Sequence, residues 1–498
     1  MHRVSSLTCT AIAAVLAVSA SIGLALPALA QDKDTVRAAL VQEPESLDPI
    51  YDTNLPALTI FYNVLDQLAG IDATGKVVPR LATSWTASDD LKSWSFKLRE
   101  GATCQDGSPI TSADVLFTFE TAMTDPKSRV GGYLTAVEKV EAKGDYEVDF
   151  TLKQAFAPFD RQATLVPIVC KAAYEAMGAA AYAKTPVGSG PYQVVSWTAG
   201  DSITLKRFDS YWGDKGKYAN VLFQVVPDET TRANAVQSGD LDVALLGPSN
   251  VPAVQASGAV DVVTQQSNRI LYLGFNSKQP MLSKLDMRKG IDMAIDRGLV
   301  AERLLDGSVT PTSQLVAPAS FGFDTAIPAT TTDLEQAKAL IAAAGYDGSP
   351  IPLSYPTTGL PQIDQIAQAV DFFVQQAGVK TTLDPQEANT YINSWFTGSL
   401  PGLYLFAFAP SVMDADLPFS MLLKTGGQGY NSDAEIDALL DKQIAEADPV
   451  ARAADLSKIS TIVNTNTYYA PLFIDTYTYG VAKGLNWSPR PDGMIVFY

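Results

Sequence analysis

Histidine is nearly absent from this sequence. The one histidine among the 498 residues is His2, which lies within residues 1–30. We predict that these residues form a secretory signal peptide, because Arg3 precedes an apolar run from Ala11 to Leu26 and an Ala-x-Ala pattern ends at Ala30. Cleavage after Ala30 would leave a mature protein without imidazole. That absence excludes Ser-His-Asp and Cys-His catalysis, HExxH metal sites and most zinc or nickel sites.

Long hydrophobic runs and excess positive charge are absent too. The apolar run of the predicted signal is shorter than the roughly 20 residues that span a bilayer, and no later run reaches that length. We therefore expect an exported protein without a membrane anchor. Lys and Arg number 36 against 54 Asp and Glu, which gives a formal net charge of −18. A surface this acidic repels nucleic acid and anionic lipid, so we predict no nucleic-acid partner.

Cysteine is scarce, and Cys104 and Cys170 are the cysteines outside the predicted signal. In an oxidising compartment an even number of cysteines favours a disulfide between them. A reactive thiol pair is the alternative, but the sequence has no CxxC motif and only Lys171 places a basic group close to either cysteine. We predict the disulfide Cys104–Cys170.

Strands and helices alternate along the chain, which is typical of an α/β protein. Apolar or alternating runs predict strands at Thr35–Val41, from Ser93 and repeatedly after Gly190. A capping box at Thr111–Asp114 predicts a helix start, and 137–153 reads as a hairpin. The roughly 468 residues after the signal exceed what one hydrophobic core usually supports, so we expect two or three domains.

Two later helix starts are predicted from capping motifs. Thr332 and Ser432 each stand three residues before a glutamate, Glu335 and Glu435 respectively. Between them, the apolar segment 403–409 (LYLFAFA) is predicted to be a strand. The C-terminal part is therefore expected to form a second α/β unit.

Two glycine-rich stretches look like phosphate-binding loops. The first is TPVGSGPYQVVSW, Thr185–Trp197, but a dinucleotide fingerprint needs a strand before the glycines and a helix after them, whereas Pro191 and strand residues follow Gly190. We predict a sharp chain reversal there. The second, Gly70–Val77 (GIDATGKV), matches GxxxxGK but ends in valine where magnesium binding needs a hydroxyl. We predict a surface turn.

Acidic pairs offer an alternative, enzymatic interpretation. Paired carboxylates serve glycoside hydrolysis, and the pairs are Asp89 with Asp90, Asp240 with Asp242, and Asp414 with Asp416. Solvated turns are the commoner role of such pairs. A secreted hydrolase therefore stays open as an alternative function.

Aromatic residues concentrate between Tyr391 and Phe408. Side chains on one face of a strand share an environment, so packing in the core is the structural alternative for Tyr404, Phe406 and Phe408. Trp395 and the loop beyond Phe408 are better candidates for lining a cleft.

Ordered motifs recur over nearly the whole chain after residue 30. They are EPESLDP (43–49), GKVVPRLATSWTASDD (75–90), TPVGSGPY (185–192), LKRFDSYWG (205–213), VPDETTRANAVQSGDLDVA (226–244), YLGFNSKQPMLSKLDMRKGIDMAIDR (272–297) and GYNSDAEIDALL (429–440). This set resembles the large substrate-binding proteins of bacterial ABC importers, solute-binding protein family 5, which includes dipeptide, oligopeptide and nickel binders. The resemblance implies an α/β fold of the periplasmic binding protein type II, with two α/β lobes around a ligand cleft and an extra small mixed domain.

The resemblance also implies a division into domains. Domain I would comprise 31–75, 186–275 and 483–498, domain II would be the insert 76–185 that holds both cysteines, and domain III would be 276–482. Ligand would be enclosed between domains I and III by hinge closure.

Two departures from the family pattern affect the expectations. Relatives usually have an aromatic-His-Asp-Gly turn where this chain has Thr103-Cys104-Gln105-Asp106-Gly107. Peptide binders of the family place an aspartate, which neutralises the ligand's amino group, soon after the strand that resembles 403–409. Here Pro410 to Met413 occupy that stretch and the first acids are Asp414 and Asp416. The family's ordinary peptides are therefore disfavoured, and the lack of histidine disfavours nickel chelates.

We predict a periplasmic solute-binding protein that captures a peptide-like solute, an opine or another small organic solute and delivers it to the permease subunits of an ABC transporter. No catalysis, cofactor or metal is expected, the membrane is met only through the permease, and the protein is expected to be a monomer. An exported receptor or chaperone on the same scaffold is a further alternative. The predicted ligand contacts are Tyr51, Asn54, Tyr272, Asn276, Trp395, Phe408, Ser411, Met413 and Asp414. Packing of the hinge by Tyr51 or Tyr272, and a turn cap for Asp414, are the structural alternatives.

Overall fold

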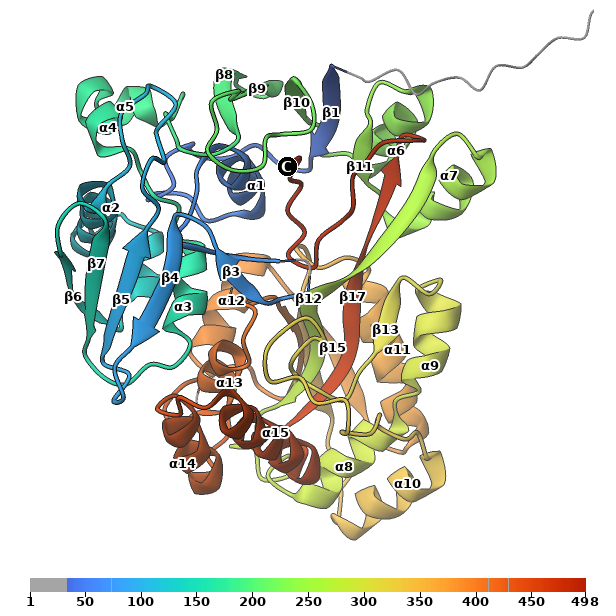
Figure 1. Ribbon diagram of the computed structural model, residues 1–498. Coiled ribbons are helices and arrows are strands. Elements are labelled where there is room, and N and C mark those ends of the chain that lie inside the picture. The colour runs from blue at the N-terminus through green and yellow to red at the C-terminus, as the bar shows by residue number, and fades with distance from the viewer. Residues whose placement is uncertain (1–33, 73, 411, 429) are drawn as a thin grey trace, which may run out of the picture. The chain divides into compact units, whose positions relative to one another are not determined.

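A large mixed sheet runs through the protein (Figure 1). The computed structural model describes residues 34–72, 74–410, 412–428 and 430–498, so the predicted signal peptide and Ser411 lie outside the described residues. Neighbouring strands follow the order β15-β14-β16-β12-β17-β11-β1-β10-β9-β8, and β13 pairs with β17 off this path. The strands are β1 (Thr35–Leu40), β8 (Tyr192–Thr198), β9 (Ser202–Arg207), β10 (Asn220–Val225), β11 (Val243–Leu245), β12 (Asp261–Phe275), β13 (Val309–Pro311), β14 (Ile351–Pro356), β15 (Thr381–Gln386), β16 (Leu403–Phe408) and β17 (Tyr469–Val481).

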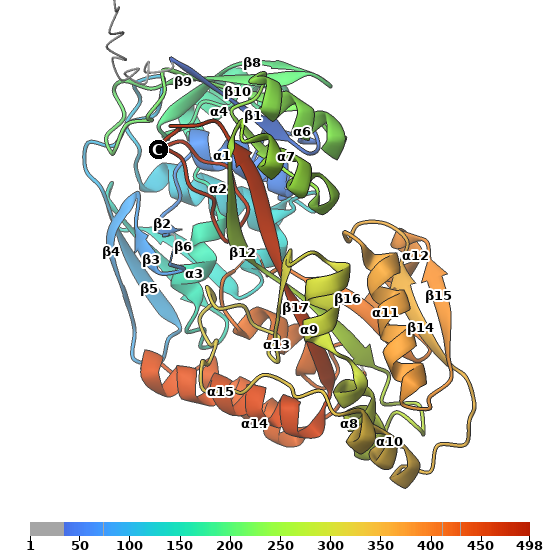
Figure 2. The same cartoon turned by 90° about the vertical axis from the view of Figure 1, so that its right-hand side faces the viewer.

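The long strands β12 and β17 form the middle of this sheet. They pair antiparallel from Asp261 opposite Val481 to Gly274 opposite Tyr469, and Figures 1 and 2 show them side by side along their length. On one side of them β1 pairs in parallel with β10 and β11, and on the other β14 pairs in parallel with β15 and β16. Two α/β arrangements therefore share one pair of strands.

A smaller antiparallel sheet occupies the predicted insert. Its order is β4-β5-β7-β6, and a short hairpin of β2 and β3 precedes it. These strands are β2 (Ala69–Ile71), β3 (Val77–Pro79), β4 (Ala82–Ala87), β5 (Ser93–Leu98), β6 (Val137–Ala142) and β7 (Glu147–Leu152). Phe96, Phe119, Phe150 and Phe159 pack edge to face or tilted in its core, an arrangement that aromatic rings favour.

The predicted disulfide closes this insert. Cys104 and Cys170 are bonded and fully buried, with their Cα atoms 6.2 Å apart. The disulfide prediction is confirmed.

Helices pack on both sheets. They are α1 (Leu55–Val64), α2 (Ser112–Thr124), α3 (Phe159–Gln162), α4 (Lys171–Met177), α5 (Ala179–Tyr182), α6 (Glu229–Ser238), α7 (Val251–Ser257), α8 (Leu285–Ala294), α9 (Arg297–Leu299), α10 (Leu334–Ala343), α11 (Ile363–Gln376), α12 (Ala388–Phe396), α13 (Asp416–Leu423), α14 (Ala434–Gln443) and α15 (Pro449–Asn466), with short helical turns at Val130–Leu134, Ala163–Leu165, Pro248–Asn250 and Val300–Leu304. The capping box of α2 is present as predicted, since Thr111 and Asp114 cap reciprocally. The caps of α10 and α14 are Asp333 and Asp433, one residue after the predicted Thr332 and Ser432.

The glycine-rich segment before β8 is a close-packed chain reversal. The amide of Gly190 donates to the carbonyl of Val64 at 2.9 Å, at the end of α1. A Cβ added at Gly188 would lie 2.1 Å from that same carbonyl oxygen, so only glycine fits. No helix follows the glycines, because the chain enters β8 directly. The chain-reversal prediction is confirmed.

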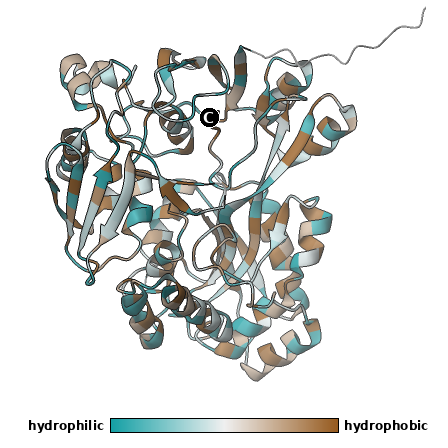
Figure 3. Ribbon diagram, viewed as in Figure 1, coloured by the Kyte–Doolittle hydropathy of each residue, from teal (hydrophilic) through white to brown (hydrophobic). Residues whose placement is uncertain are grey.

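Hydrophobic and hydrophilic residues are interspersed along the helices (Figure 3). Within the ranges that the structure describes, no helix is both long and apolar enough to cross a membrane. The α/β prediction is confirmed. Asp34–Tyr498 forms one compact unit, and the division into three domains stays a prediction.

Candidate functional site

A break in strand pairing positions Arg269 at the middle of the large sheet. The register between β12 and β17 shifts between Gln266 and Ile270, and an irregularity of this kind re-aims side chains and often lies beside a binding site. Within the break, the side chain of Asn268 donates to the carbonyl of Pro410 at 2.7 Å. The break is thereby tied to the segment that follows β16.

Near this break, the alternation of side chains along β12, β16 and β17 places several of them on the same face of the sheet. Leu271 of β12 lies directly opposite Ala407 of β16, and on β17 Phe473, Asp475 and Tyr477 follow at intervals of two residues. Side chains at such positions share a face of the sheet. That face borders a cavity, which we call the central cavity.

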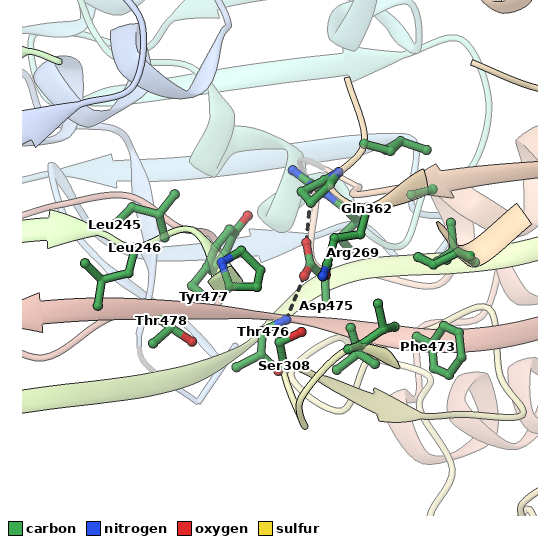
Figure 4. A pocket seen from close by; sticks show the side chains of 18 of the residues that line it. Leu245, Leu246, Arg269, Ser308, Gln362, Phe473, Asp475, Thr476, Tyr477 and Thr478 are labelled. Carbon is green, nitrogen blue, oxygen red and sulfur yellow. Dashed lines mark hydrogen bonds and ion pairs between the residues drawn. The ribbon is translucent and has the colours of Figure 1, made fainter. Parts of the chain in front are cut away.

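The central cavity has a volume of about 210 Å³ and is bordered by segments from both ends of the crossing strands. Val41, Leu55 and Leu245 come from the β1, α1 and β11 side, whereas Leu360 and Ala407 come from the β14 and β16 side. Figure 4 shows Leu245 and Leu246 on one flank, Phe473 on the other, and Arg269 with Asp475 between them. Mostly apolar walls with few polar groups are typical of small-molecule sites.

Arg269 and Asp475 form an ion pair in this cavity. Nη1 of Arg269 lies 3.2 Å from Oδ2 of Asp475, and the side chains are 27% and 26% exposed. Burial raises the pKa of Asp475, and the charge of Arg269 opposes that rise. Among the described residues bordering the cavity, these two are the charged ones.

Gln362 borders the same cavity with an unusual backbone. Its φ of 53° lies in the left-handed region, which costs a non-glycine residue energy, and it immediately precedes α11. Strain of this kind clusters at ligand sites.

Three predicted contacts, Tyr272, Trp395 and Phe408, lie together on the opposite face of the sheet. Nε1 of Trp395 donates to the hydroxyl of Tyr272 at 3.1 Å, and both side chains are fully buried. The Phe408 ring stacks on Trp395 with centroids 6.5 Å apart. They belong to an aromatic cluster with Tyr404 and Tyr469, and none of them borders the central cavity.

Two other predicted contacts, Asn54 and Asn276, satisfy backbone groups. The side chain of Asn54 caps α1 by accepting from the amide of Ala57 at 2.9 Å. Asn276 donates to the carbonyl of Leu400 at 2.6 Å. Neither borders the central cavity, but Leu55, the neighbour of Asn54, does.

Tyr51 points to the insert. Its hydroxyl donates to Oδ2 of Asp125 at 2.7 Å, and burial, followed by the bond to Asp125, raises the pKa of Tyr51 to about 12. It packs against the core of the small sheet, in keeping with the structural alternative.

Met413 and Asp414 lie together at a contact between the insert and the last helices. Arg161 of α3 donates to the carbonyl of Met413 at 3.0 Å, and its Nε lies 3.5 Å from Oδ2 of Asp414. Arg452 of α15 donates to both oxygens of Asp414 at 2.8 and 2.6 Å. As ligand contacts, the described members of the predicted set stay predictions.

Asp414 and Asp416, one of the acidic pairs considered for hydrolysis, are hydrogen-bonded to neighbouring side chains. Asp414 is bound by Arg452, and Asp416 accepts from Gln443 and from Ser420. Burial, and then the charge of Asp414, raises the pKa of Asp416. The contacts with Arg452 and Arg161 commit the carboxylate of Asp414 to structure.

Two other cavities are less suited to the role. One of about 720 Å³ lies between α8, α10 and α15 and is bordered only by residues between 286 and 340 and between 461 and 471, so it does not join both sides of the crossing strands. Another of about 170 Å³ borders Asp414, Asp416 and Gln162. Across the ranges 34–72, 74–410, 412–428 and 430–498, no cluster of three or more His, Cys, Asp or Glu side chains could hold a metal ion.

Sequence reasoning missed the residues that border the central cavity. Arg269 and Asp475 are 206 residues apart, and no local pattern joins them. The one available signal was that each is a charge in an otherwise apolar strand run, RILYLGF and PLFIDTY.

Known proteins similar to this chain are solute-binding proteins. The description "Bacterial extracellular solute-binding proteins, family 5 Middle" matches residues 76–430. The probable D,D-dipeptide-binding periplasmic protein DdpA of Escherichia coli (strain K12) is 26% identical over 511 residues, which cover 98% of each chain. The glutathione-binding protein GsiB of Shigella dysenteriae serotype 1 (strain Sd197) is 25% identical and covers 88% of this chain and 89% of its own.

A solved structure confirms the fold. The ABC transporter substrate-binding protein CtaP from Listeria monocytogenes superposes with a TM-score of 0.84 at 26% identity, covering 93% of this chain and 98% of that one. The predicted fold class is thereby confirmed, as is the prediction that the protein is not an enzyme, since the matched family consists of non-catalytic binding proteins. The chain belongs to the bacterial extracellular solute-binding proteins, family 5.

Proposed function

We propose that this protein holds a small organic solute in the central cavity and hands it to the permease subunits of an ABC importer. The observation that carries the proposal is the lining of the cavity from both sides of β12 and β17. A ligand that touches both sides binds the closed arrangement more tightly than the open one, and this differential affinity drives closure.

The ligand class is supported by the cavity walls and by relatives. The walls are leucine, valine, proline and phenylalanine side chains around a small polar group, which suits an apolar body with few polar anchors. The two relatives above are named as a probable D,D-dipeptide-binding protein and a glutathione-binding protein. A peptide-like solute, an opine or another small organic solute therefore stays the proposed class.

We propose a periplasmic location, reached through cleavage after Ala30. N-terminal sequencing of protein from the periplasmic fraction is expected to begin at Gln31. A mature protein that retains residues 1–30 would contradict this part of the proposal.

A cavity-blocking variant tests the binding site. Ala407→Trp places an indole in the central cavity, whereas Val450→Trp places it on the surface, where Val450 is 77% exposed. A solute at 100 times its dissociation constant stabilises the folded protein by about 2.7 kcal/mol. In a melting-temperature screen we expect wild type and Val450→Trp to shift with the same solutes and Ala407→Trp to shift with none. Equal melting-temperature shifts in all three proteins would show that the solute binds outside the central cavity.

The permease partner is tested by uptake. Cells lacking either this protein or the permease are expected to lose uptake of the bound solute. Activity that persists without the permease would favour an exported receptor or chaperone.

A further inference from the structure

We propose that the ligand carries an α-amino-acid head group, with its ammonium and carboxylate on one carbon, joined to an apolar body. Arg269 binds the carboxylate and Asp475 binds the ammonium. This inference rests on the proposed function, because it assigns the charge pattern of the solute in the central cavity.

The free hydrogen-bonding capacity of the ion pair supports this assignment. Nη1 of Arg269 donates to Oδ2 of Asp475, and within the described residues its guanidinium donates to no other protein group. A guanidinium has five N–H donors arranged as a fork that fits a carboxylate. Closing the cavity without a ligand acceptor would leave these donors unsatisfied, which is costly.

Asp475 retains acceptor capacity as well. Its Oδ1 accepts from the amide of Thr476 at 2.9 Å and its Oδ2 from Arg269. Each carboxylate oxygen has two lone pairs, so an ammonium group fits beside the existing partners. Burial already raises the pKa of Asp475, and a ligand cation would favour its charged form.

Charge balance disfavours a ligand with a single charge. The charged side chains at the cavity are one cation and one anion in contact. A ligand with a single charge would leave an uncompensated charge in an enclosed site, which is strongly unfavourable. A zwitterion keeps the site neutral and also offers an ionic partner to each member of the pair, which an uncharged solute does not.

The short separation of the pair selects the α-amino-acid arrangement. The two protein groups are 3.2 Å apart, so the ligand charges that replace or flank this contact must also lie close together. Each added residue lengthens an extended chain by about 3.3–3.6 Å, which moves the termini of a dipeptide apart. Leu271, Phe473 and Leu360 then surround the apolar body of the ligand.

Titration calorimetry of wild-type protein tests the charge pattern directly. The probes are L-leucine, L-phenylalanine and L-tryptophan, with N-acetyl-L-leucine lacking the ammonium, L-leucinamide lacking the carboxylate, and L-leucyl-L-leucine separating the charges. The N-acetyl derivative, the amide and the dipeptide of phenylalanine and of tryptophan are used in the same way. We expect at least one amino acid to bind and its own N-acetyl derivative, amide and dipeptide to bind roughly 30-fold or more weakly, as expected for loss of a buried charge partner. No binding by any of the three amino acids, or equal binding by the blocked analogues, overturns the inference.

Substitutions then test whether Arg269 and Asp475 are the residues that bind the ligand's charged groups. Arg269→Gln and Asp475→Asn are each expected to weaken amino-acid binding by roughly 30-fold or more. Arg207→Gln is the matched control, since Arg207 pairs with Asp209 at 2.8 Å on the surface, and it is expected to bind like wild type. Unchanged binding in both cavity variants overturns the assignment.

The proposed function can survive this test. If a solute without adjacent opposite charges binds wild type and is lost in Ala407→Trp, the inference fails and the cavity remains the binding site. If no solute binds and none is retained from cells, both fail.

Discussion

The carboxylate of Asp414 accepts hydrogen bonds from Nη1 and Nη2 of Arg452 at 2.8 and 2.6 Å, with both side chains buried. This bidentate pair ties the segment after β16 to helix α15. The first aspartate after β16 is thereby committed to a structural pair.

Asp414→Asn is expected to destabilise the protein by about 3–5 kcal/mol, because it leaves the buried Arg452 without its ionic partner. Urea unfolding measures the loss. Asp441→Asn, which removes the partner of exposed Lys424, is the control and is expected to cost less than about 1 kcal/mol. Similar small losses in both variants would contradict the structural role.

Reduction of the Cys104–Cys170 disulfide is expected to lower the stability of the insert by about 4 kcal/mol, since the bond closes a loop with a sequence separation of 66 residues. Melting with and without reductant measures the effect. The variant Cys104→Ala/Cys170→Ala is the control, and its melting temperature is expected to be the same with and without reductant. A wild-type melting temperature that is unchanged by reduction would count against the prediction.

Gly188→Ala is expected to cost about 1–3 kcal/mol through overpacking, because its Cβ would meet the carbonyl oxygen of Val64 at 2.1 Å. Gly132→Ala is a matched control, since nothing lies within 4 Å of its added Cβ. Thermal unfolding of the two variants side by side gives the difference. Equal melting temperatures would show that the backbone of the chain reversal shifts without cost to accommodate the added methyl group.

Asp66 is expected to make stability depend on pH between about 4 and 6. Burial raises its pKa to about 6, although Tyr211 and Trp212 donate to it at 2.9 and 3.1 Å. The folded protein therefore holds a proton that the unfolded chain, with the usual pKa of 3.8, has released. Stability falls by about 3 kcal/mol as pH rises through this window and then levels off.

The comparison for this effect is Asp66→Asn, which keeps an acceptor but does not titrate. Urea unfolding at pH 4, 5, 6 and 7 is expected to show the free energy of wild type falling relative to the variant. Parallel curves would mean that Asp66 is ionised throughout.

Local patterns predicted individual elements better than their exact boundaries. The capping box at Thr111 and the disulfide were predictable, because each depends on nearby or scarce residues. At the starts of α10 and α14, the predicted caps Thr332 and Ser432 are each followed by an aspartate. The structure uses these aspartates, Asp333 and Asp433, as the N-caps. Both residue types cap well, so only packing decides between them.

The faces of the strands were not predictable in the same way. A shift of one residue moves a strand side chain to the opposite face. Tyr272 and Phe408 were predicted for the cleft, yet their neighbours Leu271 and Ala407 border the central cavity. When a strand is apolar on both faces, its sequence does not indicate which face borders the ligand. The contact between Arg269 and Asp475 forms only when the complete fold brings β12 and β17 together.

Native mass spectrometry of the protein purified gently from the periplasm tests the central claim most directly. Wild type and Val450→Trp are expected to carry a small-molecule adduct that denaturation releases unchanged, and Ala407→Trp is expected to carry none. An adduct retained equally by Ala407→Trp would contradict binding in the central cavity.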